Sequence, residues 1–98
     1  MYIVRDIFNL KYGHFRPVKA MMEDAMKMGM MPKTKANRVL ADLTGGAYRL
    51  IMETGFDSLA EFETELAADM SKPEFQEWYK KFIEHVDSGH REILKVVV

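Results

Sequence analysis

The chain begins with a segment typical of a β-strand and continues with the pattern of an amphipathic helix. Residues Tyr2 to Leu10 are rich in β-branched and aromatic side chains, and Gly13 ends this segment. Pro17 fits the first turn of a helix, where its missing N–H is not needed. Gly29 and Pro32 are a typical end for that helix. Apolar residues recur in it at spacings of three and four: Phe15, Val18, Met22, Ala25, Met26 and Gly29.

Two further strand-like runs predict a β-hairpin. They cover Asn37 to Leu43 and Ala47 to Thr54, and residues 44–46 (Thr-Gly-Gly) lie between them. Glycine supplies the positive φ that a tight turn needs, so the two runs are expected to pair antiparallel.

Two helical segments and a last strand complete the pattern. Asp57 or Ser58 can cap the first helix, and Glu61 completes a capping box with Ser58. Pro73 begins the second helix, Gly89 is expected to end it, and residues 91–98 have the pattern of a strand. The two apolar stripes are Leu59, Phe62, Leu66 and Met70, then Phe75, Trp78, Tyr79, Phe82, Ile83 and Val86.

The predicted order of elements is therefore β-α-β-β-α-α-β. Antiparallel strands in this order, with the helices on one face of the sheet, give an α+β, ferredoxin-like fold. A chain of 98 residues is one domain by size, so we expect a single domain over residues 1–98.

Side chains alternate across a strand, so each predicted strand divides into two faces. One face is apolar apart from Asp6 and must lie under the helices: Tyr2, Val4, Phe8, Leu10, Val39, Ala41, Leu43, Tyr48, Leu50, Met52, Leu94, Val96 and Val98. The other face mixes aliphatic residues with charges: Ile3, Arg5, Ile7, Asn9, Arg38, Leu40, Asp42, Arg49, Ile51, Glu53, Arg91, Ile93, Lys95 and Val97. This mixture predicts a half-covered face, and a second copy of the chain is the economical cover because most soluble oligomers are symmetric homodimers. Two such sheets would close face to face into a barrel with an interior cavity.

The length, the element order, the split second helical segment and the half-polar sheet face together resemble the dimeric α+β barrel superfamily. Within it, the chain is similar to the NIPSNAP-like and antibiotic-biosynthesis-monooxygenase-like small proteins. The resemblance implies a homodimer and, as a common activity, cofactor-free oxygenation of aromatic substrates. Haem-degrading members pair a first-strand asparagine with a tryptophan and a histidine on the helical segment. Asn9 suits the first role, but Phe62 and Tyr79 stand at the other two positions, so we expect no cofactor and assign Trp78 to the core.

Composition and charge exclude several classes of function. The net charge is −1, and no basic excess of the kind that binds phosphates is present, so a nucleic-acid partner is not expected. The chain has no cysteine, which excludes disulfides and thiolate chemistry. No apolar run approaches the roughly 18 residues that span a bilayer, so no membrane partner is expected. Arg5 and Asp6 interrupt the first apolar stretch, which argues against a signal peptide and predicts a cytoplasmic protein.

Four polar residues on the mixed face are the first candidate site. Arg5, Asn9, Arg49 and Glu53 come from the first and third strands, which are central neighbours in a ferredoxin-like sheet. The two guanidinium groups suit an anionic small molecule, and a desolvated Glu53 can accept a proton. The alternative is that Arg5 or Arg49 simply pairs with Glu53 or Asp42 across a dimer interface.

Histidines supply a second set of candidates. His14 follows Gly13 in the first loop and can act as a general base at a barrel mouth, or can be merely solvated. His85 and His90 are five residues apart, which is not the i, i+4 spacing that places two metal ligands on one helical face. No metal site is therefore predicted.

Two functions remain open from the sequence. The first is a homodimer that binds or processes a small anionic or aromatic molecule in the barrel cavity, with Glu53 and His14 as catalytic candidates and Arg5, Asn9 and Arg49 as ligand-binding ones. The second is a non-catalytic dimerisation or interaction module. The residues do not decide whether the chain is an enzyme.

Overall fold

The order of elements in the computed structural model, which describes residues 1–30, 36–46 and 48–98, is the predicted one. It confirms the β-α-β-β-α-α-β succession, with one additional 3₁₀ turn, η1, before the last strand. The elements are β1 (Tyr2–Leu10), α1 (Phe15–Lys27), β2 (Asn37–Ala41), β3 (Arg49–Phe56), α2 (Leu59–Met70), α3 (Pro73–Phe82), η1 (Ile83–His85) and β4 (Val86–Lys95).

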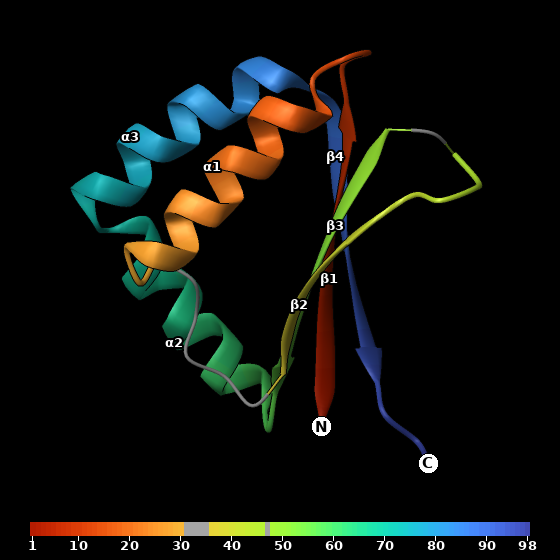
Figure 1. Cartoon of the computed structure of the whole chain (residues 1–98). Coiled ribbons are helices and arrows are strands. Elements are labelled where there is room, and N and C mark those ends of the chain that lie inside the picture. The colour runs from red at the N-terminus through yellow and green to blue at the C-terminus, as the bar shows by residue number, and fades with distance from the viewer. Residues whose placement is uncertain (31–35, 47) are drawn as a thin grey trace.

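The four strands form one antiparallel sheet in the order β2-β3-β1-β4. All three helices cover the same face of this sheet, and the opposite face carries no helix among the described residues (Figure 1). The fold is therefore ferredoxin-like, as predicted, with β1 and β3 as its central pair.

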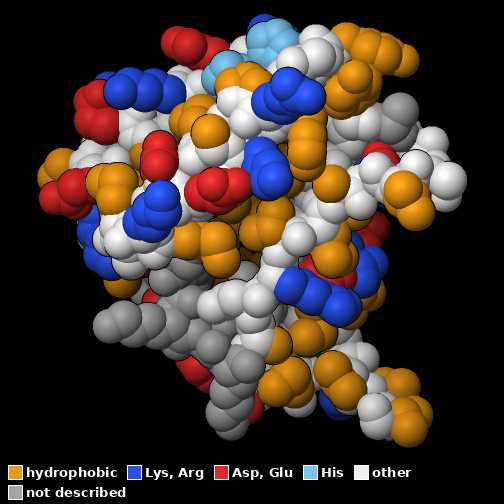
Figure 2. All heavy atoms as spheres, viewed as in Figure 1, with side chains coloured by type: hydrophobic (Ala, Val, Ile, Leu, Met, Phe, Trp, Pro, Cys, Tyr) orange, Lys and Arg blue, Asp and Glu red, His pale blue; other side chains and the backbone are white. Residues whose placement is uncertain are grey.

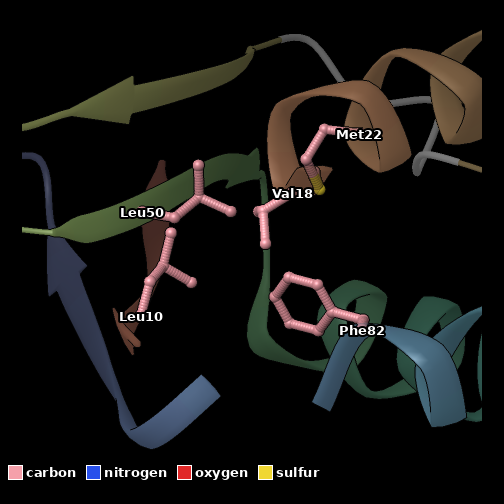
Figure 3. Packing of buried hydrophobic residues seen from close by; sticks show 5 residues of the cluster. All are labelled: Leu10, Val18, Met22, Leu50 and Phe82. Atoms are coloured by element: carbon pink, nitrogen blue, oxygen red, sulfur yellow. The ribbon is translucent and has the colours of Figure 1, made fainter. Parts of the chain in front are cut away.

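The core lies between the sheet and the α1–α3 pair. Figure 3 shows its centre, five side chains that are at most 4 % exposed: Leu10, Val18, Met22, Leu50 and Phe82. Trp78 stacks on Phe82 with ring centroids 4.9 Å apart, and its indole Nε1 donates to the carbonyl of Met21 over 3.0 Å. This bond ties α3 to α1, so Trp78 is part of the packing that joins the helices.

The predicted helix ends agree with the structure for α1 and α2. Gly29 has a φ of 69°, and the N–H groups of Gly29 and Met30 donate to the carbonyls of Met26 and Ala25, which is a Schellman motif. Pro32 lies outside the described residues. At α2, the Ser58 hydroxyl accepts from the Glu61 N–H over 3.1 Å. Two stripe positions were wrong, because Met26 is 56 % exposed and Gly29 is also exposed.

The end of α3 differs from the prediction. We expected the helical stripe to run to Val86 and to end at Gly89, but α3 ends at Phe82 and β4 already begins at Val86. Gly89 lies inside β4 opposite Phe8, and a Cβ there would lie 3.1 Å from the Ile7 carbonyl oxygen and 3.1 Å from a Phe8 ring carbon. The glycine is therefore explained by close packing between strands and not by a helix end.

The side chains of β4 were also assigned to the wrong faces of the sheet. Ile93 pairs with Val4 and Arg91 pairs with Asp6, so both lie on the helix side of the sheet, whereas Leu94 pairs with Ile3 on the outer side. A shift of one residue exchanges the two faces of a strand. The end of the chain has aliphatic residues at successive positions, so alternation alone does not fix its register.

The two hairpin strands are displaced from their predicted limits. β2 ends at Ala41 instead of Leu43, and β3 begins at Arg49 and continues to Phe56 instead of Thr54. The Asp42 carboxylate accepts from the backbone N–H of Arg49 over 3.1 Å and from its guanidinium Nε. A side chain therefore takes the place of strand pairing at this end of the hairpin.

Candidate functional site

A cavity of about 360 Å³ lies between the helices and the sheet. Val4, Phe8 and Met52 form part of its floor on the central strands, and Trp78 and Tyr79 form part of the α3 wall. Its size falls in the usual range for small-molecule pockets, and most of its surface is apolar.

The position of α2 explains why this space is not filled. No residue of α2 is buried, although its stripe was predicted to pack on the sheet. Phe62, near the start of α2, contacts Phe56 with ring centroids 5.5 Å apart, and Leu66 and Met70 further along line the cavity. α2 is thus held at its first turns and forms a wall along the cavity.

One ion pair crosses from β1 to β4 at this cavity. The guanidinium Nε of Arg91 donates to Asp6 Oδ1 over 2.6 Å, and Arg91 Cζ lies 5.3 Å from the centre of the Phe62 ring. Both residues line the cavity, as do the carboxylates of Glu65 and Asp69. The polar part of the lining can therefore both donate and accept hydrogen bonds, and among the described lining residues carboxylates outnumber guanidinium groups.

The sequence analysis missed this site. Asp6 was the one polar residue on the face assigned to the helices, which is the signal that could have identified it. Arg91 was placed on the opposite face because the register of β4 was wrong, so its pairing with Asp6 was not expected.

The four polar residues of the first candidate site lie on the outer face, as expected, but they form separate contacts. Arg5 binds Glu53 over 2.7 Å, whereas Arg49 binds Asp42 over 2.9 Å. The amide Nδ2 of Asn9 donates to the Ser88 hydroxyl over 3.0 Å. These ion pairs form within one chain, whereas the alternative expected from the sequence placed such pairs across a dimer interface.

Glu53 is the most enclosed of these groups. Its side chain is 7 % exposed, and its two carboxylate oxygens accept from Arg38 over 2.6 Å and from Arg5 over 2.8 Å. The Arg38 guanidinium, together with that of Arg5, holds the pKa of Glu53 below its ordinary value of 4.5, although burial acts in the opposite direction. A lowered pKa makes this carboxylate a weak base, and a catalytic role for Glu53 stays a prediction.

His14 is brought together with His85. Their Nδ1 atoms are 2.8 Å apart, and the ring centroids are separated by 5.1 Å. Both side chains are half-buried at the end of the molecule where β1 turns into α1. The two histidines are separated by 71 positions in the sequence, and spacing along the chain could not have revealed their contact.

Two absences apply to the described part of the chain. Within residues 1–30, 36–46 and 48–98, no helix has the length and apolar character needed to cross a membrane. The same residues contain no group of three or more metal-ligating side chains.

Comparison with known proteins gives a clear structural result. The sequence matches no protein-family model and no curated protein. Among solved structures, a NIPSNAP domain protein from Burkholderia xenovorans superposes with a TM-score of 0.89 at 10 % identity, covering 100 % of this chain and 96 % of that one. A NIPSNAP family protein of unknown function from Agrobacterium tumefaciens gives 0.88 at 16 % identity, covering 98 % and 87 %.

A second group of solved structures shares the fold less closely. An antibiotic biosynthesis monooxygenase superposes with a TM-score of 0.75 at 13 % identity, covering 100 % of both chains. At these identities the likeness concerns the fold and not the activity. The predicted resemblance is thus confirmed for the architecture: this chain has the ferredoxin-like α+β fold of the NIPSNAP-domain and antibiotic-biosynthesis-monooxygenase structures.

Proposed function

We propose that the protein binds a small, uncharged, largely aromatic molecule in the cavity between the helices and the sheet. The observation that carries this proposal is the cavity itself, about 360 Å³ with a mostly apolar lining and the Asp6–Arg91 pair at its polar side. Apolar walls supply affinity, and a few polar groups fix orientation. A polar substituent on the ligand can donate to Asp6 or accept from Arg91.

The charge of the lining favours an uncharged ligand over an anion. Among the described residues that line the cavity, Asp6, Glu65 and Asp69 bring three carboxylates against the guanidinium of Arg91 and the imidazole of His90, and the Lys72 ammonium lies 3.5 Å from Asp69. An anion would meet net repulsion in a partly desolvated space, where charges interact more strongly than in water. The sequence predicted an anionic or aromatic ligand inside a dimer barrel. The proposed ligand is aromatic, and its binding site lies on the helix side of the sheet.

Binding can be tested with N-phenyl-1-naphthylamine, an uncharged probe whose fluorescence rises in apolar surroundings. Trp78 is the only tryptophan of the chain and lines the cavity, so a bound probe should quench its emission by energy transfer. We expect saturable binding at one probe per chain. The sulfonated analogue 8-anilinonaphthalene-1-sulfonate should bind more weakly because of the carboxylates.

A matched pair of variants locates the probe. In Leu66→Trp the larger side chain takes space from the cavity, whereas Leu59→Trp places the same group on α2 at a residue that does not line it. Displacing about five ligand atoms at ~0.3 kcal/mol each should weaken binding roughly tenfold for Leu66→Trp. Equal probe affinity in both variants, read from probe emission, would show that the cavity is not the binding site.

We also propose that a second copy of the chain covers the outer face of the sheet. Ile3, Leu40, Ile51 and Leu94 share this face: Ile3 and Ile51 lie on the central strands β1 and β3, and Leu40 and Leu94 lie on the flanking strands β2 and β4. Glu53 and Asp42 are already paired within the chain, and Glu92 lies 3.7 Å from Arg5, so the carboxylates described on this face keep cationic partners when it is covered. The cavity and this interface use opposite sides of the sheet, so ligand binding and assembly are compatible.

A further inference from the structure

The histidine pair, His14 and His85, lies outside the cavity and takes no part in the proposed function. Figure 2 shows histidine side chains gathered at the top of the molecule, where Figure 1 places the β1–α1 turn beside the end of α3. Both rings point their Nδ1 atoms at each other across 2.8 Å. Two neutral imidazoles can share one N–H···N hydrogen bond at that distance.

The same distance is that of two cis ligands on one metal ion. Imidazole nitrogens bind divalent transition metals at about 2.0 Å, and two such bonds at a right angle place the nitrogens about 2.8 Å apart. Metal binding replaces the N···N contact, and each ring has to turn about its Cβ–Cγ bond, a broad torsion, until both lone pairs point to a common centre.

The backbone holds both histidines in place. The Lys11 N–H donates to the His85 carbonyl over 2.9 Å, and the His14 N–H donates to the Lys11 carbonyl over 3.1 Å. The His14 carbonyl in turn accepts from Val18 in the first turn of α1. Two ligands so constrained lose little conformational entropy when a metal binds, which raises affinity.

We propose that His14 and His85 form a binding site for a divalent transition metal that prefers tetragonal nitrogen coordination, Cu²⁺ or Ni²⁺. The two Nδ1 atoms occupy adjacent positions of the metal, and water completes its coordination. Because the ligands come from opposite ends of the chain, the metal would join the β1–α1 turn to η1 and stabilise the native state.

Cu²⁺ is the sharpest probe, because it binds most tightly in the divalent series and its electron paramagnetic resonance spectrum counts coordinated nitrogens. We expect one equivalent to bind to the full chain with the hyperfine pattern of two equivalent imidazole nitrogens. The melting temperature should rise on addition of the metal. A spectrum with one or no imidazole nitrogen would overturn the proposal without any variant.

Three histidine variants supply the comparison by titration calorimetry. His14→Gln and His85→Gln should each lower the Cu²⁺ affinity at least about tenfold, in the range seen when metal-site partners are removed. His90→Gln is the matched control, because His90 is the third histidine of the chain and lies exposed on β4. Equal affinity in all four proteins, or a loss confined to His90→Gln, would contradict the proposed site.

Discussion

Glu53 shows how single residues set the outer face of the sheet. Its carboxylate lies on a central strand and accepts from two guanidinium groups, Arg38 on β2 and Arg5 on β1. Three strands are thereby joined through one side chain. Removing the charge leaves two arginines without this partner, and hydrogen bonds to charged groups contribute about 1.5–3 kcal/mol each to stability.

We predict that Glu53→Gln lowers the free energy of unfolding at neutral pH. The free energy of unfolding of the variant should also change less than that of the wild type as the pH falls. The folded-state pKa of Glu53 is lowered, so its contribution is present above the ordinary value of 4.5 and is lost as the pH falls below it. The gap in urea midpoint between the wild type and the variant should therefore narrow between about pH 6 and pH 3.

Glu63→Gln is the control for this measurement, because Glu63 is an exposed carboxylate on α2. Its midpoint should follow the wild type at every pH. The difference in urea midpoint between the wild type and Glu53→Gln could instead stay constant down to the lowest pH. That result would show that Glu53 has the same pKa in the folded and unfolded chains.

At the scale of elements, Gly89 decides how β4 approaches β1. The positions that a Cβ would contact include the Ile7 carbonyl oxygen, which is backbone and cannot move aside alone. We predict that Gly89→Ala destabilises the protein by about 1–3 kcal/mol, the usual effect of inserting a methyl group into a packed position. Urea unfolding of the variant measures this value.

Asp87→Ala provides the comparison within the same strand. Asp87 is exposed, and a substitution of this kind usually changes stability by less than about 0.5 kcal/mol. If Gly89→Ala were as stable as Asp87→Ala, the close approach of β4 to β1 would have to be more adaptable than the distances indicate.

Elements whose apolar residues follow one clear spacing, that of a strand or that of a helix, could be predicted from the sequence. Elements whose spacing fits both could not. β1 and the start of α1 follow directly from alternation, proline and glycine. The boundary between α3 and β4 did not, because Ile83 and Val86 continue a helical spacing although β4 begins at Val86. Asp6 was the one sequence signal of the cavity, and its size could not be inferred, since the stripe of α2 has the same pattern whether it packs on the sheet or stands apart from it.

At the scale of the whole molecule, the end of the chain exposes three consecutive apolar residues, Val96 to Val98. The N–H of Val96 donates to the Met1 carbonyl over 2.9 Å, whereas Val97 is 83 % exposed. Apolar side chains project at the lower right of Figure 2, where Figure 1 places the C-terminus. An uncovered apolar end of a sheet is a liability unless another chain covers it.

We predict that the native protein has a solution mass of twice 11.4 kDa, measured by light scattering together with native mass spectrometry. Deleting residues 96–98 should destabilise the protein and shift it toward monomer or aggregate. A monodisperse full-length monomer, or a truncated chain that is unchanged and monomeric, would contradict the proposed dimer. A small molecule retained in the native spectrum would identify the ligand class directly.

The alternation of β1 has a consequence for how such a protein can evolve. Neighbouring residues Arg5 and Asp6 anchor contacts on opposite faces of one strand, Arg5 with Glu53 and Asp6 with Arg91. The odd and even positions of β1 are therefore selected for different contacts, although their codons are adjacent in the gene. Under the proposed ligand binding and dimerisation, a lineage can change the cavity through substitutions at the even positions of β1 and keep the interface through unchanged odd positions.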